Sequence, residues 1–339
     1  MPENNVLTVG KLGESGLLSR ILPRLRGAKP LLGPGDDAAL IAAPDGKFVI
    51  TVDTLVENQD FRLHWPSGFE TSGFDVGWKS AAQNLSDINA MGAIATSAVI
   101  SLTLPHHTPV SWVEDLAEGF SAAMRELGAG YCAIGGGDLG QGAELSITAA
   151  LTGTLATDRP ILRSGAKAGD VVAVCGVLGV AAAGLALLDS TVSHLEWSEA
   201  ERVLVFGQRC PSPPLELGPE AARAGATAMM DLSDGLLKDG RRLAMASGVD
   251  IDFQVSTLAR DLQRLSPAAQ RLGTDPLDWV LGGGEDHGLL ATFSSAEELP
   301  EGFRVVGIVL EAGDAARERK ISVDGVIPGS AEGFDHFAG

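Results

Sequence analysis

Hydrophobic and polar positions alternate along several short segments of the chain, in the way that is typical of β-strands. In the first half this pattern covers residues 48–56 (FVITVDTLV), 98–105 and 146–155. Residues 75–92 instead repeat apolar side chains at helical spacing, and Gly92 is placed to end that helix. These segments predict strands and helices that follow one another along the first half.

The predicted helix 75–92 has two unlike faces. Its apolar face carries Trp78, Ala81, Ala82, Leu85 and Ile88. Its opposite face carries Lys79, Gln83 and Asp87 at the spacing i, i+4, i+8, which is typical of the polar side of an amphipathic helix. A second amphipathic helix is predicted over residues 110–128.

The pattern restarts after a polar link with Pro and Gly at residues 156–170, so a domain boundary is expected near residue 158. The predicted domains are residues 1–158 and 159–339. The second domain is predicted to hold two or three helices and strands at residues 171–175, 249–255, 288–293 and 303–310. This order predicts an α+β fold, or mixed α/β, and leaves the strand order open.

Residues 171–188 form an 18-residue run without a charge, which is long enough to raise the question of a membrane span. The first residues are mostly β-branched, Gly176 and Gly179 interrupt the run, and the remainder is rich in Ala and Leu. This composition favours a buried strand, a turn and a helix, so no membrane segment is predicted.

Composition and charge narrow the possible functions. A chain of 339 residues is long enough for two domains, and its net charge of −19 argues against a nucleic-acid or anionic-membrane surface. The cysteines Cys132, Cys175 and Cys210 lie far apart without a CxxC motif, so neither a disulfide framework nor a structural zinc site is indicated. A reduced, cytoplasmic setting is expected.

Acidic residues next to glycines or at the ends of apolar runs suggest chemistry. In LLGPGDDAAL, Asp36 stands beside Asp37 with no Lys or Arg closer than Lys29 or Lys47. Two such charges about 4 Å apart repel by roughly 4 kcal/mol at an intermediate dielectric, so a shielded pair favours water or a cation. Other acids in this context are Asp53, Asp87, Asp138, Asp231, Asp234, Glu285 and Asp286. One alone is more often a cap or turn residue, but together they favour Mg²⁺ or Mn²⁺, and Mg²⁺ suggests phosphates.

Familiar phosphate and nucleophile motifs fit less well. No P-loop motif occurs, and no G-x-S-x-G. Residues 135–140 (GGGDLG) satisfy G-x-G-x-x-G, which raises a dinucleotide-binding oxidoreductase as a rival. That fingerprint requires a helix next, whereas residues 143–155 have a strand pattern, and Asp138 would oppose a pyrophosphate. Two short sequence repeats weakly suggest that the halves are related. Leu-Ser-Asp occurs at residues 85–87 and 232–234, and GGGD at residues 135–138 resembles GGGED at residues 282–286.

Eight motifs together carry a family resemblance. In chain order they are GPGDDAAL, VDTLV, WKSAAQNLSDINAMGA, GGGD, RSGAKAGD, MDLSDGL, GGGED and the terminal GFDHFAG. In this order and spacing the chain resembles the thiamine-monophosphate kinase family, within the superfamily of aminoimidazole ribonucleotide synthetase. The resemblance spans nearly the whole sequence.

The resemblance implies a phosphotransferase that uses ATP and several Mg²⁺ ions to convert thiamine monophosphate to thiamine diphosphate, with ADP as the other product. It implies a homodimer in which the ATP- and Mg²⁺-binding N-terminal domains meet through their sheets. The C-terminal α/β domain is expected to complete the nucleotide and substrate site. No side chain is expected to act as nucleophile or general base, because metal-positioned in-line transfer relies on alignment and charge neutralisation.

The resemblance also implies roles for individual residues, matched motif by motif. Matches to metal ligands are Asp37, Thr51, Val52, Asp53, Asp87, Asp138, Asp231 and Asp234. Matches to ATP contacts are Gly137, Asp138, Arg163 and Ser233. Matches to substrate contacts are Asp60, Glu285 and Phe334, the last an aromatic side chain suited to a thiazolium or pyrimidine ring.

Two positions depart from the family pattern. Asp60 stands where the family usually has a substrate-contacting His, and Val52 replaces a usual Thr, where the backbone carbonyl is the expected ligand. Relatives such as an aminoimidazole ribonucleotide synthetase-like or hydrogenase-maturation enzyme share the acids and remain alternatives. A selenophosphate synthetase is expected to carry a reactive N-terminal Cys, and no Cys precedes Cys132. A non-catalytic cation-binding protein is the alternative from another class.

Overall fold

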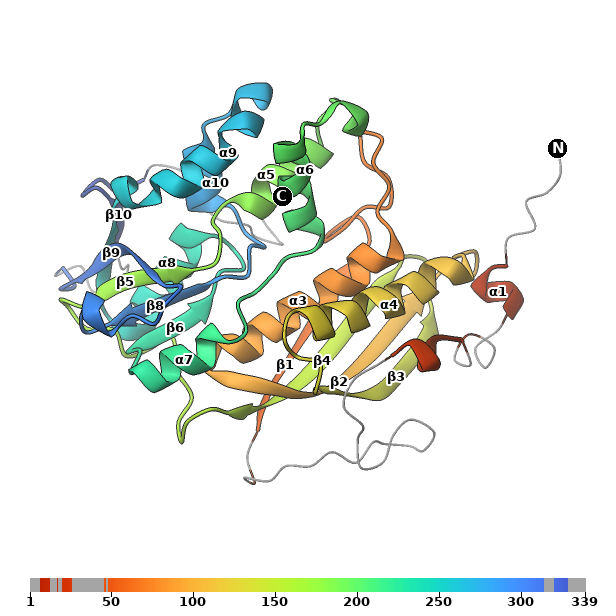
Figure 1. Ribbon diagram of the computed structural model, residues 1–339, viewed down its shortest axis with the longest axis horizontal. Coiled ribbons are helices and arrows are strands. Elements are labelled where there is room, and N and C mark those ends of the chain that lie inside the picture. The colour runs from red at the N-terminus through yellow and green to blue at the C-terminus, as the bar shows by residue number, and fades with distance from the viewer. Residues whose placement is uncertain are drawn as a thin grey trace. The chain divides into compact units, whose positions relative to one another are not determined.

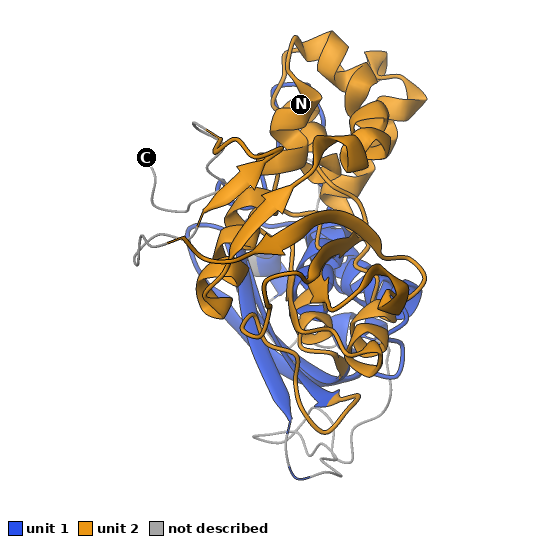
Figure 2. Cartoon of the chain, turned by 90° about the vertical axis from the view of Figure 1, so that its left-hand side faces the viewer, with its two compact units in different colours: residues 1–85, 95–154 blue, residues 86–94, 155–339 orange. Residues whose placement is uncertain are grey.

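The computed structural model describes residues 7–12, 17, 20–25, 46, 48–313 and 320–328. The chain divides into two compact units (Figure 2), the first formed by Met1–Leu85 and Ala95–Thr154 and the second by Ser86–Ile94 and Leu155–Gly339. Each unit has one mixed sheet, so the prediction of a mixed α/β fold is confirmed. The division into domains 1–158 and 159–339 stays a prediction.

The first unit contains a four-stranded sheet in the order β1-β4-β2-β3. Its strands are β1 (Val49–Val56), β2 (Ala93–Leu104), β3 (Ala133–Gln141) and β4 (Ser146–Leu155). β1 is antiparallel to β4, and β2 is parallel to β3. The helices α3 (Gly73–Ala90) and α4 (Val110–Glu126) lie over one face of this sheet (Figure 1), and short helices α1 (Val9–Leu12) and η1 (Leu22–Arg24) precede it.

Glycines allow α3 and α4 to pack closely. A Cβ atom at Gly77 of α3 would lie 2.0 Å from the Leu116 carbonyl oxygen of α4, and one at Gly119 of α4 would lie 2.1 Å from that of Phe74. The predicted apolar face of α3 is buried throughout. The opposite face carries the polar residues as predicted, but Lys79 and Gln83 are only 3 % and 9 % exposed. α3 is therefore enclosed on more than one side, and its amphipathic pattern does not mark a surface helix.

The outer face of the first sheet carries exposed apolar side chains on β1. Ile50 is 65 % exposed and Val52 is 59 % exposed, whereas Leu55, on the alternate face, is buried. On the neighbouring strand, Thr152 pairs with Ile50 and Ala150 pairs with Val52. This face is therefore apolar and threonine-rich, and no described helix of its unit covers it in Figure 1.

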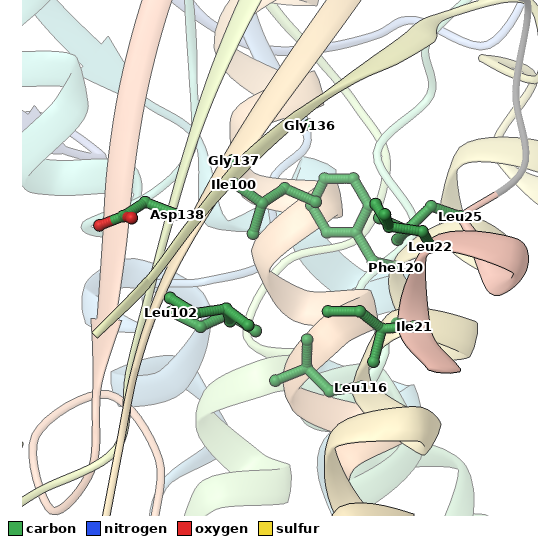
Figure 3. A pocket seen from close by; sticks show the side chains of 12 residues that line it. Ile21, Leu22, Leu25, Ile100, Leu102, Leu116, Phe120, Gly136, Gly137 and Asp138 are labelled. Atoms are coloured by element: carbon green, nitrogen blue, oxygen red, sulfur yellow. The ribbon is translucent and has the colours of Figure 1, made fainter. Parts of the chain in front are cut away.

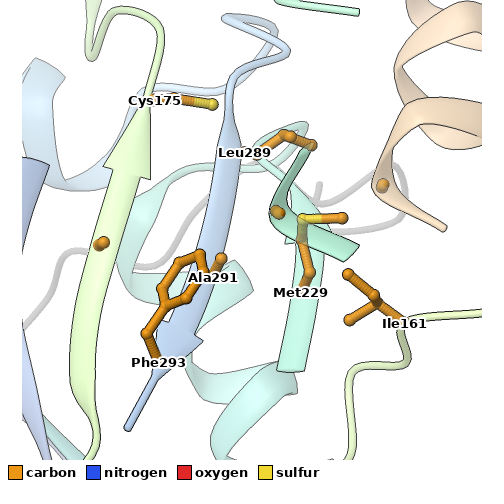
Figure 4. Packing of buried hydrophobic residues seen from close by; sticks show 9 residues of the cluster. Ile161, Cys175, Met229, Leu289, Ala291 and Phe293 are labelled. Carbon is orange, nitrogen blue, oxygen red and sulfur yellow. The ribbon is translucent and has the colours of Figure 1, made fainter. Parts of the chain in front are cut away.

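The second unit contains a six-stranded sheet in the order β10-β7-β9-β5-β8-β6. Its strands are β5 (Val171–Cys175), β6 (Ala228–Asp231), β7 (Asp250–Phe253), β8 (Leu289–Phe293), β9 (Arg304–Leu310) and β10 (Ile321–Val323). Neighbours are antiparallel except for the parallel pair β10 and β7. One core cluster joins Cys175 of β5, Met229 of β6, and Leu289 and Phe293 of β8 to Ile161 (Figure 4).

The second unit contains more helices than the two or three predicted. They are α5 (Val180–Leu188), α6 (Glu199–Arg209), α7 (Leu217–Ala224), α8 (Leu236–Ser247), α9 (Ala259–Leu272) and α10 (Pro276–Gly282), with the short η2 (His194–Glu196), η3 (Val255–Leu258) and η4 (Ala296–Glu298). The apolar run 171–188 divides into β5 and α5, as predicted. Within the described part of the chain, no helix is both long and apolar enough to cross a bilayer.

The predicted strands at 48–56, 98–105, 146–155 and 171–175 are confirmed, but β3, β6 and β10 were not predicted. β3 matters for function because it contains the GGGDLG segment. A strand at this position is incompatible with the strand-to-helix turn of a dinucleotide fingerprint, so the oxidoreductase alternative is excluded. The two Leu-Ser-Asp echoes also differ in structure, since residues 85–87 belong to α3 and residues 232–234 to the segment after β6.

Candidate functional site

β1 presents two of the predicted metal ligands. Thr51 and Asp53 lie on the same face as buried Leu55, because alternate side chains of a strand share a face, and both are half-buried. The Asp53 backbone N–H donates to Asn84 Oδ1 at 3.1 Å, which ties β1 to α3. Val52 points to the other face, so a ligand role for this residue rests on its backbone carbonyl.

The GGGD segment lies in β3, where Gly137 is paired with Ile100 of β2 and Asp138 with Ser101. A Cβ atom at Gly137 would lie 1.6 Å from the Ile100 carbonyl oxygen, so only glycine allows the two strands to approach here. The Asp138 side chain is exposed. The strand pairing therefore fixes the backbone of both predicted ATP contacts in this unit.

An apolar pocket lies beside this segment (Figure 3). Its lining includes Leu22, Leu25, Ile100, Leu102, Leu116 and Phe120. In Figure 3 the Asp138 carboxylate points away from Phe120 and Leu25. A volume of about 40 Å³ has room for one or two waters but not for a nucleoside, so this pocket is not assigned to ATP.

Asp60 closes the turn that follows β1. Its Oδ2 accepts a hydrogen bond from the Val56 backbone N–H at 2.7 Å, and its own N–H donates to the Val56 carbonyl oxygen at 2.9 Å. The Lys79 ammonium donates to the Asp60 carbonyl oxygen at 3.1 Å. These bonds give Asp60 a structural role in its turn.

In the second unit, two loops rich in predicted site residues pair through their backbones. The Glu285 N–H donates to the Ser233 carbonyl oxygen at 2.8 Å, and the His287 N–H donates to the Leu232 carbonyl oxygen at 3.0 Å. The Leu232 N–H donates in return to the Gly288 carbonyl oxygen at 2.8 Å. Residues 231–235 and 282–288 are therefore held together as one pair of loops.

Glycines make this pairing possible. A Cβ atom at Gly284 would lie 2.5 Å from the Ser233 carbonyl oxygen. Gly235 has φ +111°, and a Cβ there would lie 2.7 Å from the Gly282 carbonyl oxygen. The glycines of MDLSDGL and GGGED thus explain how the backbones of Ser233 and Glu285 come close together.

Asp231, at the end of β6, is buried within this pair of loops. Ser86 Oγ lies 3.3 Å from Asp231 Oδ2, to which it donates, and 3.2 Å from the His287 carbonyl oxygen. His287 Nδ1 lies 3.5 Å from the same Asp231 oxygen. The next residue of α3, Asp87, is half-buried. Ser86 and Asp87 of the first Leu-Ser-Asp motif thus belong to the same unit as the second motif.

Asp234 and Asp239 share a cation from the protein. Arg242 Nη1 lies 2.5 Å from Asp234 Oδ2 and 2.9 Å from Asp239 Oδ1. Asp239 Oδ2 accepts hydrogen bonds from the N–H groups of Asp234 and Gly235 at 2.9 and 3.0 Å. Burial raises the pKa of Asp239 to about 7, and the nearby carboxylates of Asp231 and Asp234 also raise it.

Arg163 lies in an exposed loop that is tied to the end of α8. Its carbonyl oxygen accepts a hydrogen bond from Ser247 Oγ at 3.0 Å. The N–H groups of Gly165 and Ala166 each donate to the same hydroxyl at 3.1 Å. The backbone of this RSGAKAGD segment is thus anchored while the Arg163 side chain is exposed.

Sequence reasoning missed Asp239 and Arg242 and gave Asp286 no role. Asp286 accepts hydrogen bonds at the start of α5, and Asp239 fixes the backbone beside Asp234. A signal for Asp239 was present, because Asp and Arg at i, i+3 on one helix are neighbours. The partners of Asp286 are more than 100 residues away, so no local pattern could reveal them.

Two predicted site residues, Asp37 and Phe334, lie outside the described residues, as does Asp36. Among the residues that are described, no three His, Cys, Asp or Glu side chains are grouped closely enough to hold a metal ion. Thr51, Asp53 and Asp138 belong to the first unit, and Asp87, Asp231 and Asp234 belong to the second. The described members of the predicted set are thus divided between the two units.

Comparison with known proteins gives consistent results over the whole chain. Residues 35–155 match the family "AIR synthase related protein, N-terminal domain". The thiamine-monophosphate kinase of Mycobacterium tuberculosis is 44 % identical over 305 residues, which cover 90 % of this chain and 87 % of that protein. The enzyme of the same name from Corynebacterium glutamicum is 38 % identical over 338 residues, with coverage of 97 % and 95 %.

A solved structure extends the similarity to the fold. The structure of AaThiL complexed with AMPPCP and TMP is 31 % identical in sequence and superposes with a TM-score of 0.76. The match covers 98 % of this chain and 100 % of that one. The resemblance carried by the eight motifs is therefore supported by both sequence and fold.

Proposed function

Because this chain belongs to the thiamine-monophosphate kinase family, we propose that it transfers the γ-phosphoryl group of ATP to thiamine monophosphate, giving thiamine diphosphate and ADP. The observation that carries the proposal is the match, over nearly the full length of both chains, to a structure that contains AMPPCP and TMP. AMPPCP is an ATP analogue, so that relative holds counterparts of both proposed substrates.

The proposed ATP contacts are Gly137, Asp138, Arg163 and Ser233. Arg163 is exposed on an anchored loop, which suits a guanidinium that must reach phosphate oxygens. The Ser233 carbonyl oxygen accepts a hydrogen bond from the Glu285 N–H, which fixes the backbone that carries the Ser233 side chain. Contacts within the chain therefore hold the backbone at these residues in place without a bound nucleotide.

The proposed contacts with thiamine monophosphate are Glu285, Asp60 and Phe334. Glu285 is half-buried and anionic, which suits a neighbour of the cationic thiazolium ring. At Asp60, Oδ2 accepts the hydrogen bond from the Val56 N–H, so Oδ1 is the oxygen proposed to face the substrate. Phe334 is proposed from the resemblance alone.

We propose Mg²⁺ as the cofactor, held by Asp37, Thr51, Val52, Asp53, Asp87, Asp138, Asp231 and Asp234. All of these offer oxygen donors, which hard cations prefer. Burial is the main cause of the raised pKa of Asp239, and the carboxylates of Asp231 and Asp234 raise it further, so an added cation beside these acids would be favourable. When bound, the ions would neutralise phosphate charge and align the reacting groups.

The chain's own residues then have binding and orienting roles. The acceptor phosphate is already anionic near neutral pH, so no side chain has to remove a proton from it. Arg242 and Lys238 lie 2.5 and 3.7 Å from Asp234 Oδ2 and hold that carboxylate in place. Asp239 orients the backbone N–H groups that follow Ser233.

A cytoplasmic homodimer is also part of the proposal. The exposed Ile50 and Val52 on the outer face of β1 are suited to burial against a second copy of the same sheet. The three cysteines are buried thiols, as expected for a reducing compartment. Sedimentation of the wild-type chain and of an Ile50→Asp variant tests the dimer, which is expected to dissociate in the variant.

One assay tests the reaction. The chain is incubated with ATP, Mg²⁺ and either thiamine monophosphate or the aminoimidazole precursor, and the products are identified by mass. We expect thiamine diphosphate and ADP in equal amounts. The rate should still rise with free Mg²⁺ after all the ATP is present as its Mg²⁺ complex. A product from the aminoimidazole precursor alone would favour the synthetase-like alternative, and no ATP turnover would favour a non-catalytic cation-binding protein.

A further inference from the structure

The loop at residues 282–288 holds two side-chain-bearing residues in an unfavourable backbone conformation. Glu285 has φ +66° and His287 has φ +54°. Residues with a Cβ atom rarely adopt this left-handed conformation, so the surrounding contacts must maintain it. Asp286, between them, is only 6 % exposed.

Asp286 is fixed to the start of helix α5. Its Oδ2 accepts a hydrogen bond from the Gly179 N–H at 2.5 Å, and its Oδ1 accepts one from the Ala181 N–H at 2.8 Å. Gly179, the N-cap residue of α5, has no side chain that could accept these bonds. Asp286 therefore caps α5 from a distant part of the chain.

The opposite side of the same loop is fixed to residues 231–234. The N–H groups of Glu285 and His287 donate to the carbonyl oxygens of Ser233 and Leu232. Gly284 has no room for a Cβ atom against Ser233. The backbone at Glu285 is thus held from two sides, by residues 231–234 and, through Asp286, by the start of α5.

We propose that Asp286 is a positioning residue, which uses the N-terminus of α5 to fix the backbone of Glu285 and so the direction of its carboxylate toward thiamine monophosphate. The inference rests on the proposed function, because the substrate role of Glu285 comes from it. Both carboxylate oxygens of Asp286 are engaged by N–H groups and the side chain is buried, so it acts through Glu285 and not by contact with the substrate.

Steady-state kinetics of Asp286→Ala and Asp286→Asn test the proposal. We expect the KM for thiamine monophosphate to rise about tenfold in the Ala variant, and less in the Asn variant, which keeps one acceptor oxygen. The KM for ATP is expected to change less than about twofold. If the Ala variant melts below the assay temperature, the Asn variant carries the same comparison.

Ser198→Ala is the matched control. Ser198 caps α6 in the same unit, where its Oγ accepts a hydrogen bond from the Glu201 N–H, and it is not part of the proposed site. Its loss is expected to lower the melting temperature without changing either KM. A Ser198→Ala variant that shifts the KM for thiamine monophosphate as much as Asp286→Ala would overturn the proposal, because cap loss in general would then explain the effect.

A double-variant cycle with Glu285→Gln separates positioning from general stability. If Asp286 acts through Glu285, adding Asp286→Ala to Glu285→Gln raises the KM for thiamine monophosphate by less than about twofold. Equal effects in both backgrounds, or an unchanged KM in the single variants, would overturn the inference while the proposed function stands. A wild-type chain that makes no thiamine diphosphate would overturn the proposed function, and the inference with it.

Discussion

The two glycine–acid motifs of this chain, GGGD at residues 135–138 and GGGED at residues 282–286, look alike in sequence and differ in structure. The first lies in strand β3, and the second lies in a loop that contains left-handed residues. Asp138 is exposed, whereas Asp286 is buried and caps a helix. Glycines next to an acid thus allow close strand pairing in one unit and close loop packing in the other.

The glycines show most clearly what each motif needs. Gly137 makes room for the Ile100 carbonyl of the neighbouring strand, and Gly284 makes room for the Ser233 carbonyl of the neighbouring loop. In both cases an approaching backbone accounts for the glycine. Glycine-rich composition alone indicates that another backbone approaches closely. Whether that backbone belongs to a strand or a loop decides the conformation of the glycine segment.

The largest effect is expected at Gly137. A Cβ atom in Gly137→Ala meets backbone in the middle of the β2–β3 pairing, so we expect the free energy of unfolding to fall by at least about 3 kcal/mol in urea denaturation. Gly140→Ala is the control, since its nearest atoms lie 3.9 Å away. Equal stability of the two variants would show that this pairing does not require glycine.

Gly284→Ala is expected to have the next largest effect. The clash with the Ser233 carbonyl should cost about 2 kcal/mol of unfolding free energy and lower turnover of thiamine monophosphate. In Gly282→Ala a Cβ atom meets nothing within 4 Å at the end of α10, so its melting temperature should equal or slightly exceed that of the wild type. A Gly282→Ala variant that is destabilised as strongly would refute the loop-packing account.

The buried acid of the second motif predicts a dependence on pH. Burial raises the pKa of Asp286 from 3.8 to about 7. Between these values the folded chain binds a proton that the unfolded chain releases, so this group contributes stability below pH 4 that is lost as pH rises toward 7. In Asp286→Asn, the free energy of unfolding should decline less steeply between pH 5 and 7, by about 1 kcal/mol per pH unit, as measured by denaturation curves. An unchanged slope would mean that Asp286 ionises at its ordinary pKa.

The smallest effect is expected at Asp60, which belongs to neither motif. Asp60→Ala removes the acceptor for the Val56 N–H and should cost about 1 kcal/mol of unfolding free energy. The proposed contact with thiamine monophosphate predicts a several-fold rise in the KM for this substrate, with the KM for ATP within about twofold of wild type. Unchanged KM values for both substrates would leave Asp60 with its bond in the turn and no substrate role.

Periodicity predicted the elements whose side chains alternate clearly, including β1, β4, β5 and α3. It failed for β3, because a strand with glycines at half of its first six positions has no alternation to detect. It also did not predict that the polar side of α3 is buried, where Lys79 donates a hydrogen bond to the Asp60 carbonyl oxygen. Local pattern does not record which surfaces later become covered.

The resemblance identified the predicted site residues but not what holds them in place. The bonds between residues 231–234 and 285–288, and between Asp286 and α5, join segments at least 50 positions apart in sequence. Such contacts depend on the tertiary fold, and no short motif encodes them. Asp239 and Arg242 were missed for a related reason, because their partner Asp234 was read as a ligand only.

The central claim is that the strand motif serves ATP and the loop motif serves thiamine monophosphate in one phosphoryl transfer. The most direct measurement is the pair of KM values in the wild type, Asp138→Asn and Glu285→Gln. We expect Glu285→Gln to raise the KM for thiamine monophosphate at least about fivefold with the KM for ATP nearly unchanged, and Asp138→Asn to raise the KM for ATP and lower kcat. Equal shifts of both KM values in each variant, or no shift in either, would contradict the account.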